Sequence, residues 1–147
     1  MLKQHIQTNQ MMNTFNSGNG LGRKKFIPGI AWFFLVLLLL CLPGSNLPNV
    51  DDWLNAIYFD KWIHVGLFAV LAFLFMWPFI KSALPVKDKW LYVIRIAIAG
   101  SVWGLTTECI QKYFVPGRSF DLFDWAADSL GVLIALIYCR IRFFRPA

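Results

Sequence analysis

Four long apolar runs constrain the fold of this chain more than any other feature. They occupy residues 26–42, 60–80, 90–112 and 124–139, and each is close to the ~20 residues that an α-helix needs to cross the hydrocarbon core of a bilayer. Backbone polar groups inside a bilayer must be satisfied within the segment, so a spanning run of this length folds as a helix. The sequence therefore predicts an all-α polytopic membrane protein, a bundle of four transmembrane helices.

The composition supports one membrane domain and excludes a nucleic-acid-binding protein. The chain has 147 residues, of which 58% are hydrophobic and only 15% are charged, whereas soluble domains carry about 25% charged residues. The net charge of +6 comes from basic residues that lie beside the apolar runs, as topology signals do, and they form no groove-reading motif. Residues 1–22 are polar and predict a disordered cytoplasmic tail, and residues 23–145 form the predicted transmembrane domain.

The first apolar run resembles a signal peptide because Arg23, Lys24 and Lys25 precede it. A cleavage site needs small residues, and the segment around Cys41 has none in the required positions. We therefore expect an uncleaved first transmembrane helix. The three cysteines have no CxxC spacing, which predicts neither a disulfide framework nor a zinc motif.

The distribution of charge predicts the orientation of the helices. With four spans, eleven of the 14 basic residues fall on one side, and only Lys61, Lys112 and Arg118 fall on the other. Seven of the eight acidic residues lie on that second side, and Asp88 is the exception. The positive-inside rule then places both termini in the cytoplasm. The eleven basic residues are Lys3, Arg23, Lys24, Lys25, Lys81, Lys87, Lys89, Arg95, Arg140, Arg142 and Arg145.

Polar residues gather between the third and fourth apolar runs. Ionisable groups are costly near the membrane core, so such a cluster is a candidate functional site. Residues three or four apart share a helix face, which groups Glu108 with Gln111. The same spacing groups Asp121, Asp124 and Asp128 on one face, where either of the first two could cap the fourth helix.

A second group of polar residues opens the second apolar run. Asp60 and His64 are four residues apart and therefore share a helix face. Lys61 lies between them in the sequence. Asp60 could simply cap the helix. His64 lies one turn inside an apolar helix, where an imidazole needs a partner. Arg118, in the turn after Pro116 and Gly117, could bind a carboxylate or a phosphate. It could instead form a salt bridge with Glu108 or Asp121.

These residues support two alternative functions. In the first, Glu108 and His64 are base and acid, Arg118 holds a phosphate or carboxylate, and Asp124 and Asp128 orient His64 or bind a cation. The candidate catalytic residues are Glu108, His64, Arg118 and Asp128. In the second, the protein is not an enzyme, and the polar network only locks the second, third and fourth helices together. The wider polar cluster consists of Asp60, Lys61, Gln111, Asp121 and Asp124.

No cofactor and no resident metal ion are predicted, although Asp and Glu oxygens could bind a hard cation. No nucleophile stands out. Gly100 and Gly104 on the third helix, and Ala127, Gly131 and Ala135 on the fourth, form ridges of small residues. Such ridges let membrane helices approach closely.

The spacing of the polar residues resembles that of the VanZ-like family. The matching patterns are Asp60-Lys61-x-x-His64, Glu108-x-x-Gln111, Pro116-x-Arg118 and Asp124-x-x-x-Asp128-x-x-Gly131, within residues 60–136. At the position of Asp128 the family often has an asparagine-like residue. The resemblance implies a small multi-pass protein of the bacterial cytoplasmic membrane, linked to tolerance of teicoplanin, a glycopeptide antibiotic.

The resemblance carries no biochemical mechanism. Together with the polar cluster it predicts partners in the cell envelope: membrane lipid, and a lipid-linked envelope substrate or cell-wall precursor. The sequence indicates no particular oligomeric state.

Reporter fusions test the predicted orientation. We expect fusions after Ala83 and after Ala147 to report a cytoplasmic location, and a fusion after Asn49 to report an external one, because of the charge asymmetry described above. The measurement is the activity of a paired reporter that works on only one side of the membrane. An external signal after Ala83 would contradict the orientation and move the polar cluster to the cytoplasmic side.

Overall fold

The structure, a computed structural model, describes residues 21–42 and 59–144. It is helical throughout these ranges. A 3₁₀ turn, η1 (Arg23–Phe26), leads into α2 (Ile27–Leu40), and α4 (Phe59–Ile80), α5 (Val86–Phe114) and α6 (Leu122–Phe143) follow. The tail predicted for residues 1–22 lies almost wholly outside the described residues. The all-α prediction is confirmed for the ranges that the structure describes.

Three of these helices are long and apolar enough to cross a membrane. They are α4, α5 and α6, with 22, 29 and 22 residues. At ~1.5 Å per residue even the shorter two span roughly 33 Å, about the thickness of the hydrocarbon core. Many of their large apolar side chains point outward, for example Trp62, Val102 and Ile98, each about 60% exposed. A multi-pass membrane protein is the class that these features support.

The helices extend beyond the apolar runs at several ends. We predicted 90–112 and 124–139 for the last two helices, but α5 begins four residues earlier, directly after Pro85, and α6 continues to Phe143. Lys87, Lys89, Arg140 and Arg142 therefore lie on helices. The apolar run marks the hydrocarbon core, whereas hydrogen bonding along the backbone continues into the polar interface. The first helix is shorter than predicted, because Cys41 ends it.

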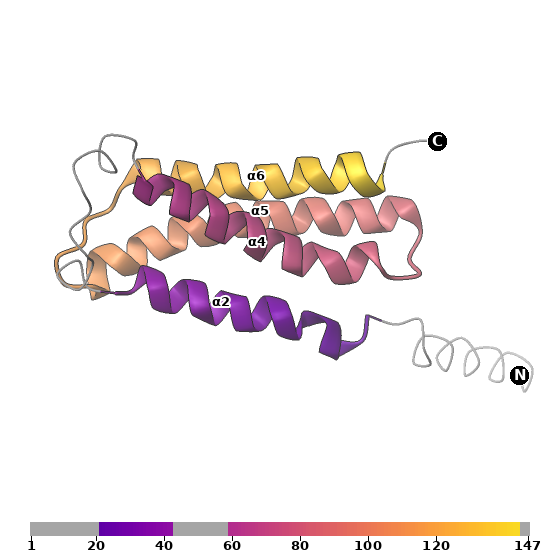
Figure 1. The fold of residues 1–147 in the computed structure, drawn as a ribbon, viewed down its shortest axis with the longest axis horizontal. Coiled ribbons are helices and arrows are strands. Elements are labelled where there is room, and N and C mark those ends of the chain that lie inside the picture. Colours follow the sequence, from indigo (N-terminus) through magenta and orange to yellow (C-terminus); the bar gives the residue numbers. More distant parts are fainter. Residues whose placement is uncertain (1–20, 43–58, 145–147) are drawn as a thin grey trace, which may run out of the picture.

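The helices α4, α5 and α6 pack side by side, and α2 lies along the other side of α4 (Figure 1). Consecutive helices run in opposite directions, so the start of α2, the α4–α5 connection and the end of α6 share one end of the bundle. The start of α4, the end of α5 and the start of α6 meet at the opposite end. The indole of Trp32 donates a hydrogen bond to the carbonyl of Leu67 at 3.0 Å, which ties α2 to α4.

The closest helix pair is α4 with α6, and glycine makes that approach possible. A Cβ atom at Gly131 would lie 2.2 Å from the carbonyl oxygen of Val65 and 3.0 Å from the backbone nitrogen of Ala69. Between α5 and α6, a Cβ at Gly104 would lie 2.8 Å from the Cβ of Asp128. Ala127 and Ala135 are also buried. These contacts confirm that the small residues form packing ridges.

Gly131→Ala should destabilise the bundle strongly, because the added methyl group meets backbone rather than a side chain that can move. Overpacking of this kind costs ~1–3 kcal/mol or more. Gly66→Ala is the matched control, since nothing lies within 4 Å of a Cβ at that helical position. That control should be neutral or slightly stabilising. The measurement is the thermal unfolding midpoint in detergent, and equal midpoints for the two variants would contradict the close approach.

Candidate functional site

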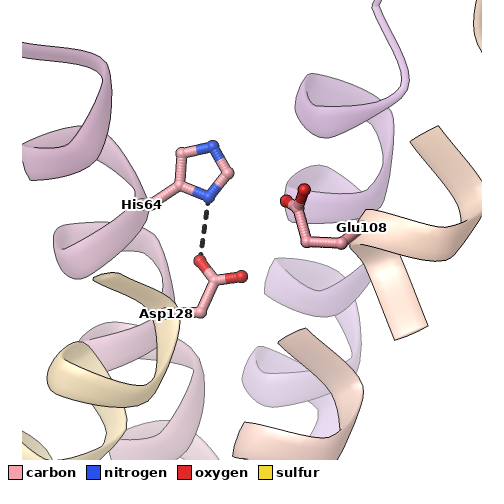
Figure 2. Close-up of side chains that lie close together, drawn as sticks. All are labelled: His64, Glu108 and Asp128. Atoms are coloured by element: carbon pink, nitrogen blue, oxygen red, sulfur yellow. Dashed lines mark hydrogen bonds and ion pairs between the residues drawn. The ribbon is translucent and has the colours of Figure 1, made fainter. Parts of the chain in front are cut away.

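Three buried polar side chains meet near the end of the bundle where α4 begins. His64 comes from the second turn of α4, Glu108 from the last two turns of α5, and Asp128 from the second turn of α6. Figure 2 shows the three side chains pointing toward one another. Their exposed fractions are 4%, 0% and 0%. The structure therefore brings together three of the four candidate catalytic residues; we call His64, Glu108 and Asp128 the inner site.

His64 and Asp128 form the one direct bond within the inner site. The Nδ1 atom of His64 lies 2.9 Å from Oδ1 of Asp128, drawn as the dashed line in Figure 2. When Nδ1 carries the proton, it donates to the carboxylate, and Nε2 is left as the acceptor. Gly104 provides the room for Asp128, because any larger side chain there would collide with the carboxylate. The pair can therefore orient the imidazole, as the sequence predicted.

Glu108 completes the inner site from the other side. Its Oε2 accepts a hydrogen bond from the backbone N–H of Asp121 at 2.9 Å. Its Oε1, and Oδ2 of Asp128, have no hydrogen-bond partner within the part of the chain that the structure describes. A ligand atom from each of the three residues lies within 4.8 Å of the other two. The inner site therefore has two buried carboxylate oxygens free to bind something else.

Lys61 lies one turn before His64 and forms the outer layer of the site. Its ammonium donates to Oδ2 of Asp121 at 2.7 Å and to Oδ1 of Asp124, and it lies 3.0 Å from Oδ2 of Asp60. Asp121 caps α6, because its Oδ1 accepts from the N–H of Phe123 at 2.8 Å. The Lys61 ammonium holds the pKa of the Asp121 carboxyl below its usual value. This ion cluster ties the start of α4 to the start of α6.

Other groups make the contacts that we expected of Arg118. Within residues 21–42 and 59–144 the guanidinium of Arg118 forms no ion pair, so the pairing of Arg118 with Glu108 or Asp121 is not observed. The backbone of Asp121 reaches Glu108 instead, and Lys61 provides the cation. Gly117 explains the difference: its φ of 75° turns the chain so that Asp121, three residues after Arg118, meets the end of α5.

The other predicted polar residues have structural contacts. Gln111 is buried and donates from Nε2 to the carbonyl of Leu40 at 2.9 Å, so it holds the end of α2. Asp60 is the second residue of α4 and its side chain is 64% exposed, so it belongs to the rim. Asp124 is buried, and its Oδ2 lies 4.0 Å from Nε2 of His64. It therefore links the outer layer to the inner site.

Sequence reasoning missed an apolar cavity beside this site. The cavity has a volume of about 260 Å³ and is lined by Phe33, Phe68, Ala99, Gly100 and Trp103, among others. The indole N–H of Trp103 is buried with no partner among the described residues. A tryptophan in the middle of an apolar run gave no signal of this, because the cavity needs residues from α2, α4, α5 and α6 together.

Comparison with known proteins finds similarity without an activity. The chain is 32% identical over 104 residues, 71% of its length, to the uncharacterized protein C11E3.10 of Schizosaccharomyces pombe. It spans only 58% of the length of that relative. No family model matches the chain, and no solved structure matches it. The relative is eukaryotic, so the similarity does not support a bacterial setting.

Lys61→Met should destabilise the protein, because it leaves the buried carboxylate of Asp124 and that of Asp121 without their shared cation. An unsatisfied buried polar group costs about 1–3 kcal/mol, and a charged one costs more. Arg118→Met removes a cation from the neighbouring turn and should change the free energy of unfolding by less than about 0.5 kcal/mol. The measurement is the unfolding midpoint of each variant in detergent. A larger loss for Arg118→Met than for Lys61→Met would restore Arg118 as the cation of the site.

Proposed function

We propose that this chain is a VanZ-like membrane protein that binds a membrane lipid, with the headgroup at the inner site and an acyl chain in the apolar cavity. The observation that carries this proposal is the position of the cavity relative to the inner site. Gly100 lines the cavity, and Gly104, one turn or ~6 Å further along α5, contacts Asp128. Phe68 and Val132 also line the cavity, and each lies one turn after an inner-site residue, His64 and Asp128. An apolar pocket close to a few convergent polar groups is a common form of a ligand site, and this arrangement suits an amphipathic molecule.

The size of the cavity supports the same occupant. At about 260 Å³ it is larger than the ~150 Å³ engineered cavity that binds benzene in another protein, so it can hold part of a hydrocarbon chain. Phe33 belongs to α2 and forms one wall together with Trp103, with ring centroids 4.7 Å apart. Aromatic side chains that pack in this way present flat apolar surfaces to a chain lying against them.

The chemistry of the inner site supports an action on the headgroup. The Asp128 carboxylate fixes the ring of His64, which can then accept or donate a proton at Nε2. Glu108 offers a second buried carboxylate within reach of the same space. A histidine held by one carboxylate and facing another is suited to general acid–base chemistry. The catalytic residues of this proposal are His64 and Glu108, and Asp128 is a positioning residue.

We further propose that α2 is a fourth span and that both termini are cytoplasmic. The α2 helix has 14 residues, or roughly 21 Å, and η1 extends it at the basic end. Ile27, Phe34 and Leu38 are each about 60% exposed along it, as expected of a surface that faces lipid. The basic residues then lie in the cytoplasm and the inner site opens on the outer face of a bacterial cytoplasmic membrane. The resemblance of the polar spacing to the VanZ-like family supports a role in the cell envelope. There the bound lipid would be a phospholipid or a lipid-linked cell-wall precursor, and the phenotype would be a change in glycopeptide tolerance.

A structural role is the second candidate, and the ion cluster around Lys61 favours it. Lys61 joins α4 to Asp124, in the first turn of α6, and to Asp121, the N-cap residue of that helix. Glu108 joins α5 to the backbone of Asp121. A network that only locks helices together gains most when all of its members are satisfied. Glu108 Oε1 and Asp128 Oδ2 are not satisfied by described residues. A binding site explains those two oxygens, whereas a lock does not.

Ala99→Trp tests the lipid proposal, because Ala99 lies at the exposed rim of the cavity and an indole there should fill it. Ile98→Trp is the matched control, since Ile98 is its neighbour and points outward. The probe is phosphatidylethanolamine with a photoreactive acyl chain, in vesicles with phosphatidylglycerol. We expect crosslinks to Phe33 and Trp103 in the wild type and in Ile98→Trp, and at least a tenfold loss in Ala99→Trp.

Glu108→Gln should keep the unfolding midpoint of the wild type while glycopeptide tolerance in a bacterial host is lost. Equal crosslinking of both tryptophan variants, or stability lost together with the phenotype, would favour the structural role.

A further inference from the structure

We propose that the inner site binds one divalent transition-metal ion, Zn²⁺ in the first instance, through His64, Glu108 and Asp128. This inference rests on the proposed function, because it gives the same site the positive charge with which to hold the phosphate of a lipid headgroup. It also departs from the sequence prediction, which included no resident metal ion, and in it His64 and Glu108 hold the ion instead of acting as acid and base.

The geometry of the three ligand atoms fits a single ion. Nδ1 of His64 and Oδ1 of Asp128 are 2.9 Å apart, and one atom from each of the three residues lies within 4.8 Å of the others. Two ligands on a tetrahedral zinc ion at about 2.1 Å are roughly 3.4 Å apart. For two ligand atoms 4.8 Å apart, each atom would have to move roughly 0.7 Å toward the other to reach this spacing. A glutamate side chain can move that far. The ion would take the place of the proton between His64 and Asp128, and Asp128 would bind it through both carboxylate oxygens.

Two unsatisfied oxygens point to a ligand independently of this clustering. Glu108 and Asp128 are completely buried, and Oε1 of the first and Oδ2 of the second have no hydrogen-bond partner among the described residues. Burying a carboxylate without a partner is costly, and buried charges are normally paired or coordinate a metal. Figure 2 shows both carboxylates directed into the space beside the imidazole. A cation in that space satisfies both oxygens at once.

The balance of charge points to a cation with two positive charges. The only described ammonium at this end of the bundle that pairs with carboxylates is that of Lys61, and its partners are Asp60, Asp121 and Asp124. Neither Glu108 nor Asp128 has a lysine or arginine within ion-pair distance in the described ranges. With both carboxylates ionised and the imidazole neutral, the inner site would carry two negative charges. One divalent ion balances them, whereas a phosphate alone would be repelled.

The ligand set selects the kind of metal. One imidazole nitrogen with two carboxylates suits zinc and its neighbours in the first transition series, while calcium and magnesium prefer oxygen ligands alone. Three protein ligands leave a coordination position open, which is the pattern of catalytic rather than structural zinc sites. The backbone N–H of Asp121 holds Oε2 of Glu108, and such outer contacts fix the direction of a ligand. The open position would face the headgroup.

Zinc binding to the purified protein tests this inference. Protein in detergent, stripped with EDTA and dialysed, is titrated with ZnCl₂ by calorimetry, and its metal content is measured after desalting. We expect one zinc per chain for the wild type and at least a ~100-fold weaker affinity for Glu108→Gln and Asp128→Asn. Asp88→Asn is the control, because Asp88 lies in the first turn of α5 at the opposite end of the bundle, and its affinity should equal that of the wild type.

A second measurement covers the case in which the inner-site variants do not fold. Co²⁺ added to the wild-type protein should give visible absorption bands of a low-symmetry nitrogen and oxygen site, and ZnCl₂ should abolish them. Two results would overturn the inference: less than a tenth of an equivalent of bound zinc in the wild type, or an unchanged zinc affinity in a folded Glu108→Gln protein. Water or a shared proton would then satisfy the two oxygens. Lipid crosslinking that persists with no zinc binding would overturn the metal site alone. Stoichiometric zinc binding that Glu108→Gln abolishes supports the metal site even where lipid crosslinking is absent and the proposed function fails.

Discussion

The contact between α4 and α6 at Gly131 is the constraint on which the rest of the structure depends. The backbone of α6 comes so close to Val65 that a single methyl group would not fit. Val65 follows His64, and Gly131 lies one turn after Asp128, so the same close approach places the imidazole against the carboxylate at 2.9 Å. Helices separated by larger side chains would leave both groups buried and unpaired, which apolar surroundings penalise heavily.

The charges at this end of the bundle divide into two layers with different roles. In the outer layer, Lys61 neutralises aspartates and fixes the start of α4 to the start of α6. In the inner layer, no lysine or arginine of the described ranges pairs with Glu108 or Asp128, although these two are the more deeply buried pair. Stability alone would favour the opposite arrangement, because an uncompensated charge costs more where water is absent. Departures of this kind are expected where a site is kept ready for a ligand.

The helices could be predicted because the apolar runs required them, and much of the site could be predicted because helical spacing is regular. Asp60, Lys61 and His64 lie in the first two turns of α4, and Asp124 and Asp128 share a face of α6, as spacing indicated. Helix ends were less accurate, since hydropathy marks the membrane core and not the end of backbone hydrogen bonding. The carboxylate contacts of Arg118 could not be predicted either, because a turn with a positive φ at Gly117 sends the following residues in a direction that spacing does not reveal.

By itself, the sequence determined the class of fold, the approximate positions of the apolar helices that the structure describes and the end of the bundle at which polar residues collect. These follow from local composition and from the 3.6-residue period of a helix. Only the tertiary structure decided which polar groups meet. His64, Glu108 and Asp128 come from three helices, and their distances depend on how closely those helices pack. The cavity beside Trp103 likewise exists only where four helices surround a space. Contacts between distant segments depend on side-chain volumes at every interface, and no local pattern in the sequence records that sum.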